Sequence, residues 1–196
     1  INFYGCQESQ IASILRDAQY LKALSTNHAT TLESLRIHCS VFPDLVHVSQ
    51  LLSPLTNLHE LSFNYVELRS NPRVWPTAGA TGLVHAVQGM KKMTRLRLTG
   101  HQLTDDHISC LVPNLGELRS LNLDRDPTRT NEADAAGAAG AGALTDQALQ
   151  AIGQSCPNLQ YLSLCLQEQI TSSGLKAILK GCQLRELRIE HCPLLQ

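Results

Sequence analysis

Aliphatic residues recur along the chain in the pattern L-x-x-L-x-L, in which one polar residue separates the last two apolar positions. The six copies begin at Leu32, Leu58, Met93, Leu118, Leu159 and Leu184. Because side chains alternate between the two faces of a strand, the alternating end of each copy predicts a short half-buried strand. We expect these strands near residues 35–37, 61–63, 96–98, 121–123, 162–164 and 187–189, paired in parallel. The repetition predicts a chain built from similar units.

Consecutive copies are separated by 25 or 26 residues, except for two longer steps. Each longer step holds a segment that looks inserted, residues 69–78 and residues 127–143. Both segments follow a strand and precede a helix, so we expect them to project from the same rim of the molecule. Residues 1–6 match the second half of the motif, which indicates that the chain begins inside a unit. We expect residues 1–196 to form a single domain.

Segments with helical spacing of apolar residues lie between the predicted strands. The clearest are residues 11–21, 45–52, 149–152 and 175–179. Thr104, Thr145 and Thr171 stand where a helix N-cap is expected. A unit of one short strand and one helix cannot bury its apolar face alone, so units must stack on their neighbours. The prediction is an α/β solenoid of about seven repeats, with a concave parallel sheet and convex helices. An ordinary α/β domain is the alternative, but its strands would be uninterrupted apolar runs.

Composition narrows the function classes. Hydrophobic residues make up 43% of the chain and aromatic residues only 4%, which predicts an aliphatic core. The net charge of −1 supplies no overall field for attracting nucleic acid or an anionic membrane. No apolar run of eighteen residues predicts a membrane span. We therefore expect neither a nucleic acid nor a membrane as partner.

Seven cysteines are scattered along the chain without a C-x-x-C pair. An odd number without paired spacing favours free thiols, mostly buried, over a disulfide framework. Free thiols are typical of a reducing compartment, so the sequence favours the cytoplasm or the nucleus.

The C-terminal residues 144–196 carry the motif in a more specific form. They read C-P-N-L-Q-Y-L-S-L at 156–164, I-T-S-S-G-L-K-A-I at 170–178 and L-R-E-L-R-I-E-H-C-P-L-L at 184–195. This run resembles the cysteine-containing leucine-rich repeats of F-box proteins, a class similar to the ribonuclease-inhibitor repeats. In that class a thiol fills the turn after each strand, the position that Cys6 and Cys192 occupy here. Ser40, Val66, His101, Asp126 and Gln167 replace it in the other copies.

The resemblance implies a leucine-rich-repeat horseshoe that acts as a protein–protein interaction module. The function it favours is substrate recognition within an F-box-like ubiquitin-ligase receptor. We find no F-box in residues 1–196, so contact with a cullin-type ligase adaptor would need a segment outside them. Since repeats of one shape serve many partners, the alternative is a structural scaffold subunit of a ciliary or other large complex.

Four short motifs could carry chemistry, but each has a simpler structural explanation. His59-Glu60 lacks the second histidine of a zinc-protease helix, and its alternation places it on a strand. The acidic residues of 105–107 suit a helix N-terminus. Residues 191–192 lack companion ligands for a metal. The glycines of 137–142 lack the lysine of a phosphate-binding loop, which leaves a flexible insertion. We therefore expect no catalytic residue, metal site or cofactor, and an enzyme would need a catalytic domain outside this sequence.

The polar residues between the strand leucines should form columns on the concave face. The candidate partner-binding residues there are Arg36, His38, Asn64, Arg95, Arg97, Asp124, Tyr161, Arg188 and Glu190. Arginine and tyrosine are enriched at the energetic centres of interfaces, although the columns could also be a merely solvated face. The arginines of the first half suggest an acidic partner surface, and Asp124, Glu186 and Glu190 suggest a basic one. Trp75, the only tryptophan, is a candidate on the rim, with packing onto its own domain as the alternative.

Overall fold

The computed structural model describes residues 2–3, 23, 26–39, 52–65, 77–99, 103–125 and 144–195. The strands are β1 (Asn2–Phe3), β2 (Ser34–Cys39), β3 (Glu60–Tyr65), β4 (Arg95–Thr99), β5 (Ser120–Asn122), β6 (Tyr161–Cys165) and β7 (Glu186–Glu190). The helices are α4 (Thr77–Gln88), α5 (Asp105–Leu111), α7 (Asp146–Ser155) and α8 (Ser172–Gly181), and a short 3-10 turn, η1 (Val112–Asn114), follows α5.

The strands form one open sheet in which they stand in chain order from β1 to β7. Every neighbouring pair is parallel, as the sequence predicts. The motif leucines lie opposite one another in register, for example Leu61 opposite Leu96 and Leu96 opposite Leu121. A single inward row therefore runs from strand to strand. Leu35, Leu61, Leu96, Leu121 and Leu162 are at most 2% exposed.

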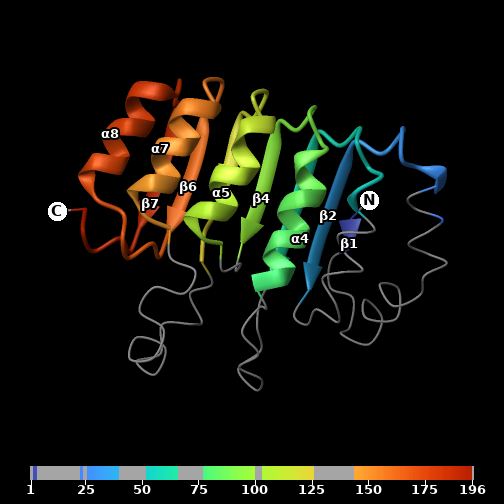
Figure 1. Cartoon of the computed structure of the whole chain (residues 1–196), viewed down its shortest axis with the longest axis horizontal. Helices are drawn as coiled ribbons and strands as arrows, with labels where there is room; N and C mark the ends of the chain where they lie inside the picture. Colours follow the sequence, from blue (N-terminus) through green and yellow to red (C-terminus); the bar gives the residue numbers. More distant parts are fainter. Residues whose placement is uncertain are drawn as a thin grey trace, which may run out of the picture.

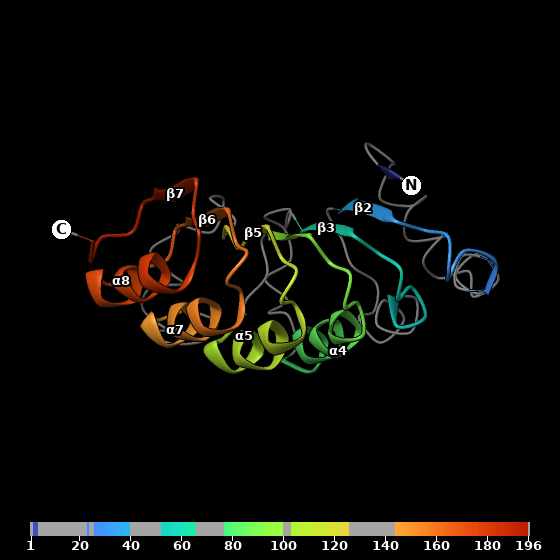
Figure 2. The ribbon, with the colours of Figure 1, turned by 90° about the horizontal axis from the view of Figure 1, so that it is seen from above.

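The helices form a second layer on one face of the sheet (Figure 1). Figure 2 shows the strands on the inner side of a shallow arc and the helices on its outer side. The other face of the sheet is covered by no helix in the part of the chain that the structure describes. Parallel sheets are usually covered on both faces. We call this face, which no described helix covers, the open face.

The helices agree with the sequence pattern in part. Leu149, Ile152 and Ile178 are buried as expected. Leu179, expected in the same apolar stripe, is 60% exposed because no described unit packs outside α8. Helix α4 was not among the predicted helical segments, and it begins at Thr77, so the last two residues of the expected insertion 69–78 belong to a helix. The predicted helix over 11–21, most of the one over 45–52 and the insertion 127–143 lie outside the described residues.

Polar bonds tie each unit to the next in a repeated way. Before each strand from β2 to β6, one backbone carbonyl accepts two N–H groups from the following unit; Glu33, His59, Thr94, Arg119 and Gln160 supply these carbonyls. The carboxylate of Asp105 likewise accepts the N–H and hydroxyl of Thr145, at 2.9 and 2.6 Å. Asp146 does the same for Thr171. The starts of α7 and α8 are therefore fixed by the unit before them.

The turn after the strand shows what replaces a cysteine in this repeat. The Cys192 thiol donates to the carbonyl of Leu164 at 3.3 Å. One unit earlier, the Gln167 amide donates to the carbonyl of Leu123 at 2.9 Å. The residues just before them, Leu166 and His191, both adopt a left-handed backbone with φ of 61° and 54°. This conformation turns the following side chain inward, so the amide of Gln167 serves the same role as a thiol.

The thiols are less buried than the sequence suggests. All cysteines whose side chains the structure describes are free. Cys156 and Cys165 are buried, Cys182 and Cys192 are half-buried, and Cys110 is exposed. Burial raises the pKa of Cys156 to about 12, so its thiol is protonated and unreactive at neutral pH. None of the described helices is long and apolar enough to cross a membrane.

Candidate interaction surface

The open face carries the polar columns that the sequence predicts. The first column reads Ser34, Glu60, Arg95, Ser120, Tyr161 and Glu186, each opposite the next in the parallel register. The second column reads Arg36, Ser62, Arg97, Asn122, Ser163 and Arg188. In β4 the exposed and buried residues alternate, with Arg95 and Arg97 exposed and the leucines between and after them buried. The register thus places Arg36, Arg95, Arg97, Tyr161 and Arg188 in columns along the strands.

A hollow of about 330 Å³ lies on this face over the middle strands. Its lining includes the small polar side chains of Ser62 and Ser120, which leave room between larger neighbours. Arg36, Arg95, Arg97 and Tyr161 also line it. Thus four of the predicted residues meet at one concave site because small residues stand between them in the columns.

The three arginines of the hollow differ in their partners. The guanidinium of Arg36 binds the Glu60 carboxylate through two nitrogens, at 2.7 and 2.6 Å. Arg95 is 65% exposed and lies 3.8 Å from the other oxygen of Glu60. Arg97 donates to the Thr99 hydroxyl at 3.2 Å, and no described carboxylate lies within ion-pair distance of it. Arg95 and Arg97 therefore keep most of their donors free for a ligand.

A chain of hydrogen bonds runs from the hollow toward β6. Thr99 donates to the side-chain oxygen of Asn122 at 3.4 Å, and Asn122 donates to Asp124 at 2.9 Å. Asp124 also accepts the Ser163 hydroxyl at 2.7 Å and the Cys165 N–H at 2.9 Å. The carboxylate of Asp124 is thus a fixed acceptor that joins two strands, and its donors are neutral.

The pKa of Asp124 reflects this environment. Burial by itself would raise it, but the hydrogen bonds from Ser163, Cys165 and Asn122 stabilise the charged form and hold the pKa below its usual value. The same carboxylate adds to burial in raising the pKa of the Cys165 thiol. Although Ser163, Cys165 and Asp124 are close together, the thiol is protonated and buried. This cluster is suited to holding strands together and offers no activated nucleophile.

The far end of the open face carries a second ion pair. Arg188 and Glu190 lie on β7 and are joined at 2.9 Å. The hydrogen bond and charge of Arg188 lower the pKa of Glu190, and those of Glu190 raise the pKa of Arg188. Glu186 is exposed on the same strand. These residues stand beyond the hollow, so the candidate residues do not form one compact site.

The remaining candidates are placed as follows. Asn64 is on the open face, and its side-chain oxygen is buried without a hydrogen-bond donor among the described residues. The backbone of His38 pairs with that of Asn64, but its side chain lies outside the described residues. Trp75 also lies outside them. Glu60, an acidic residue one strand away in the predicted columns, is the expected competitor of a ligand for the arginines, and the structure shows it paired with Arg36.

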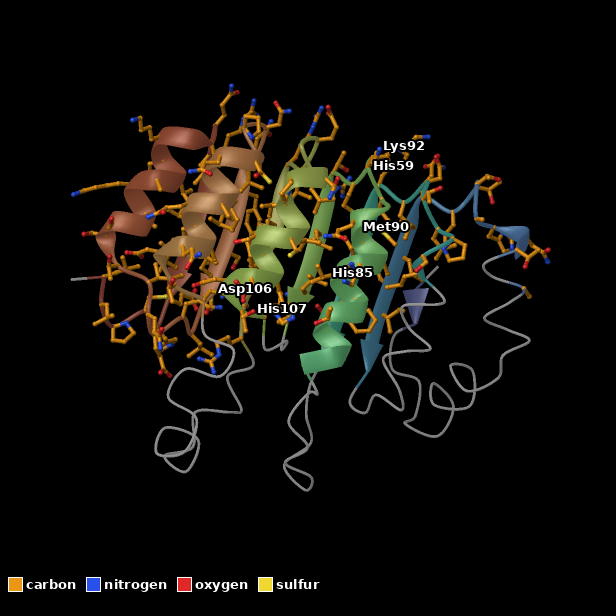
Figure 3. The ribbon with its side chains drawn as sticks, in the orientation of Figure 1. His59, His85, Met90, Lys92, Asp106 and His107 are labelled. Atoms are coloured by element: carbon orange, nitrogen blue, oxygen red, sulfur yellow. The ribbon has the colours of Figure 1, made fainter. Side chains whose placement is uncertain are left out.

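The motifs considered for chemistry have structural roles where they are described. Thr104 caps α5, and the His107 ring accepts the Thr104 N–H at 3.1 Å, so the two form a reciprocal capping box. Figure 3 shows His107 at the start of α5, on the side of α4, where its other nitrogen lies 3.3 Å from the Thr81 hydroxyl. Burial lowers the pKa of His107, and the nearby Asp106 opposes that shift only partly. Among the described residues no group of His, Cys, Asp or Glu could hold a metal ion.

Comparison of the sequence with protein-family models and with curated proteins finds no match.

Proposed function

We propose that this chain is a leucine-rich-repeat solenoid of about seven units, shaped as a horseshoe, that binds a protein partner on the open face of its sheet. The observation that carries the proposal is the hollow over the middle strands, in which the exposed Arg95 and Arg97 stand beside Tyr161. Arginine and tyrosine in a recess can supply much of the binding energy of an interface. A catalytic role has no comparable support, because the buried thiols and carboxylates of the described residues serve structural bonds.

A more specific form of the proposal is substrate recognition for a ubiquitin ligase, in the cytoplasm or nucleus. Its support is the resemblance of residues 144–196 to F-box repeats, in which the amide of Gln167 substitutes for a turn thiol. The alternative is a scaffold subunit of a large assembly. Co-purification with a cullin adaptor would favour the first, and stoichiometric recovery within a large complex without one would favour the second.

The proposed binding face is tested by replacing Arg95 and Arg97 together with alanine. Their guanidinium groups can each form paired bonds to a carboxylate or phosphoryl group, so we expect partner affinity to fall at least tenfold, about 1.4 kcal/mol. The melting transition should change little, because exposed ion pairs contribute about 0–1 kcal/mol. The measurement is a binding titration against a partner recovered from cell extract.

The matched control replaces Lys176 and Lys180 with alanine, which removes the same charge from exposed positions on α8. This variant should bind like the unaltered chain. An unchanged dissociation constant for the arginine variant would contradict the open face as the binding site.

A further inference from the structure

The charged side chains of the open face are separated by sign, with net positive charge in one half and net negative charge in the other. Its first half, over β2 to β4, carries three arginines and one glutamate, Arg36, Arg95, Arg97 and Glu60, a net of two positive charges. Its second half, from the end of β5 to β7, carries Asp124, Glu186 and Glu190 against Arg188, a net of two negative charges. The chain as a whole has a net charge of −1, so this separation is local to the sheet.

The positive half coincides with the hollow. The Glu60 carboxylate pairs with the guanidinium of Arg36 and lies 3.8 Å from that of Arg95. The net charge around the hollow is therefore that of two guanidinium groups. Arg95 and Arg97 point from the same strand on the same face, about 7 Å apart along it. A phosphorylated side chain carries a charge of about −1.5 to −2 and three acceptor oxygens, which matches this pair better than a single carboxylate does.

An extended polyanion does not match the rest of the surface. Nucleic acid gains its affinity from many phosphate contacts along a continuous basic track. Here the track ends at Asp124, and the face beyond it is acidic through Glu186 and Glu190. An anionic membrane would meet the same repulsion. The ligand that suits both halves is a peptide with one anionic group and a basic residue further along.

We propose that the open face binds a phosphorylated peptide segment that runs across the strands, with its phosphoryl group over Arg95 and Arg97 and a basic side chain over Glu186 and Glu190. From β4 to β7 there are three strand spacings of about 4.8 Å, roughly 14 Å in all. An extended peptide covers that distance in about four residues at about 3.3 Å each. The recognised motif is thus a phosphoresidue with Lys or Arg about four positions away. This inference rests on the proposed binding function and specifies its ligand.

The test uses the full chain and three libraries of twelve-residue peptides, which carry phosphoserine, serine or glutamate at a fixed central position and random residues elsewhere. We expect the phosphoserine library to be retained at least tenfold more than the serine and glutamate libraries. Sequencing of the retained peptides should show Lys or Arg enriched about four positions from the phosphoserine. Equal retention of the three libraries, or enrichment of acidic residues at that distance, would overturn the proposal.

The variants assign each half of the face. Replacing Arg95 and Arg97 with alanine should remove the preference for phosphoserine, while the Lys176→Ala and Lys180→Ala control should keep it. Replacing Glu186 and Glu190 with glutamine should keep the preference for phosphoserine and remove the basic enrichment. Persistence of both preferences in the variants would show that the phosphoryl group binds elsewhere and would overturn the assignment.

The ligand inference and the binding function can fail separately. A purified partner could bind the Arg95 and Arg97 variant less tightly than the unaltered chain, yet keep its affinity for the unaltered chain after the partner is treated with phosphatase. In that case the open face is the binding site and the phosphoryl inference is wrong. If the variant binds the partner as the unaltered chain does, the proposed function itself is wrong at this face.

Discussion

At the scale of single residues, the open face combines groups that are free to bind with groups that are fixed by neighbours. In the columns predicted from the sequence, Arg97 and Asp124 are close neighbours. In the structure they do not pair, because Thr99 and Asn122 stand between them in a chain of hydrogen bonds. The alternation of residues predicts the face of each side chain but not its partner, since long side chains reach across strands. The sequence therefore predicts the columns and leaves the pairing of their long side chains undetermined.

Asp124 makes a testable contribution to stability. Its pKa is lower in the folded chain than the ordinary value of 3.8, so its contribution is present above that value and is lost as pH falls through the lower folded pKa. We expect Asp124→Asn to reduce the free energy of unfolding by about 1 kcal/mol at pH 7, after allowance for solvent screening of a half-buried group. The difference from the unaltered chain should shrink as the pH falls below 3.8 through the lower pKa of the folded chain. Urea denaturation at pH 7 and at acid pH measures it.

The control for this prediction is Glu117→Gln, which alters an exposed carboxylate of the same charge in a turn outside the helices and strands. It should leave the unfolding free energy nearly unchanged at both pH values. A loss that is the same at pH 7 and at acid pH would contradict the role of the charged form of Asp124.

At the scale of elements, the capping residues of the helices could be predicted from the sequence, but the bonds between one helix start and the next unit could not. Thr104, Thr145 and Thr171 cap their helices as the sequence indicates, because a Thr hydroxyl satisfies a free N–H of the first turn. The use of Asp105 and Asp146 to bind the next unit depends on the spacing of stacked helices, which local sequence does not contain. Helix α4 escaped prediction because it follows a long segment that obscures the repeat period.

The capping box of α5 gives a prediction at this scale. Burial lowers the pKa of His107 below the ordinary value of 6.5, so the neutral ring stabilises the fold above pH 6.5 and this contribution is lost as pH falls through the folded pKa. Gln at the same position can also accept the Thr104 N–H, but it does not titrate. We expect His107→Gln to have a free energy of unfolding that varies less between pH 7 and pH 5 than that of the unaltered chain.

The measurement is thermal or urea unfolding at intervals across that range. His85, an exposed histidine on α4 that is labelled in Figure 3, supplies the control His85→Gln. The control should keep the full pH dependence. If His107→Gln keeps it as well, the buried ring is not the titrating group.

At the scale of the whole molecule, the order and direction of the strands followed from the repeat because each copy of the motif places equivalent leucines one strand apart. What the repeat could not predict is the difference between units. On β6, Ser163 is 0% exposed although it faces the open side, whereas Tyr161 on the same strand is only half-buried. The last unit lacks a described neighbour on its outer side, and its leucines are half-buried or exposed. Position in the stack thus matters as much as position in the motif.

This dependence leads to a prediction about where a core substitution matters most. Leu121 is 0% exposed between the units on either side, whereas Leu187 holds the same register position on β7 and is only half-buried. Leu121→Ala should lower the free energy of unfolding by about 2–5 kcal/mol, since it leaves a cavity that its packed surroundings cannot fill. Leu187→Ala should lower the free energy of unfolding by less, because part of the leucine surface already faces water.

Since each unit contacts only its neighbours, amide exchange should accelerate in the units adjacent to Leu121 before the distant ones. Urea unfolding and hydrogen exchange measure both effects, and a loss below about 1 kcal/mol for Leu121→Ala would contradict its enclosure by three units.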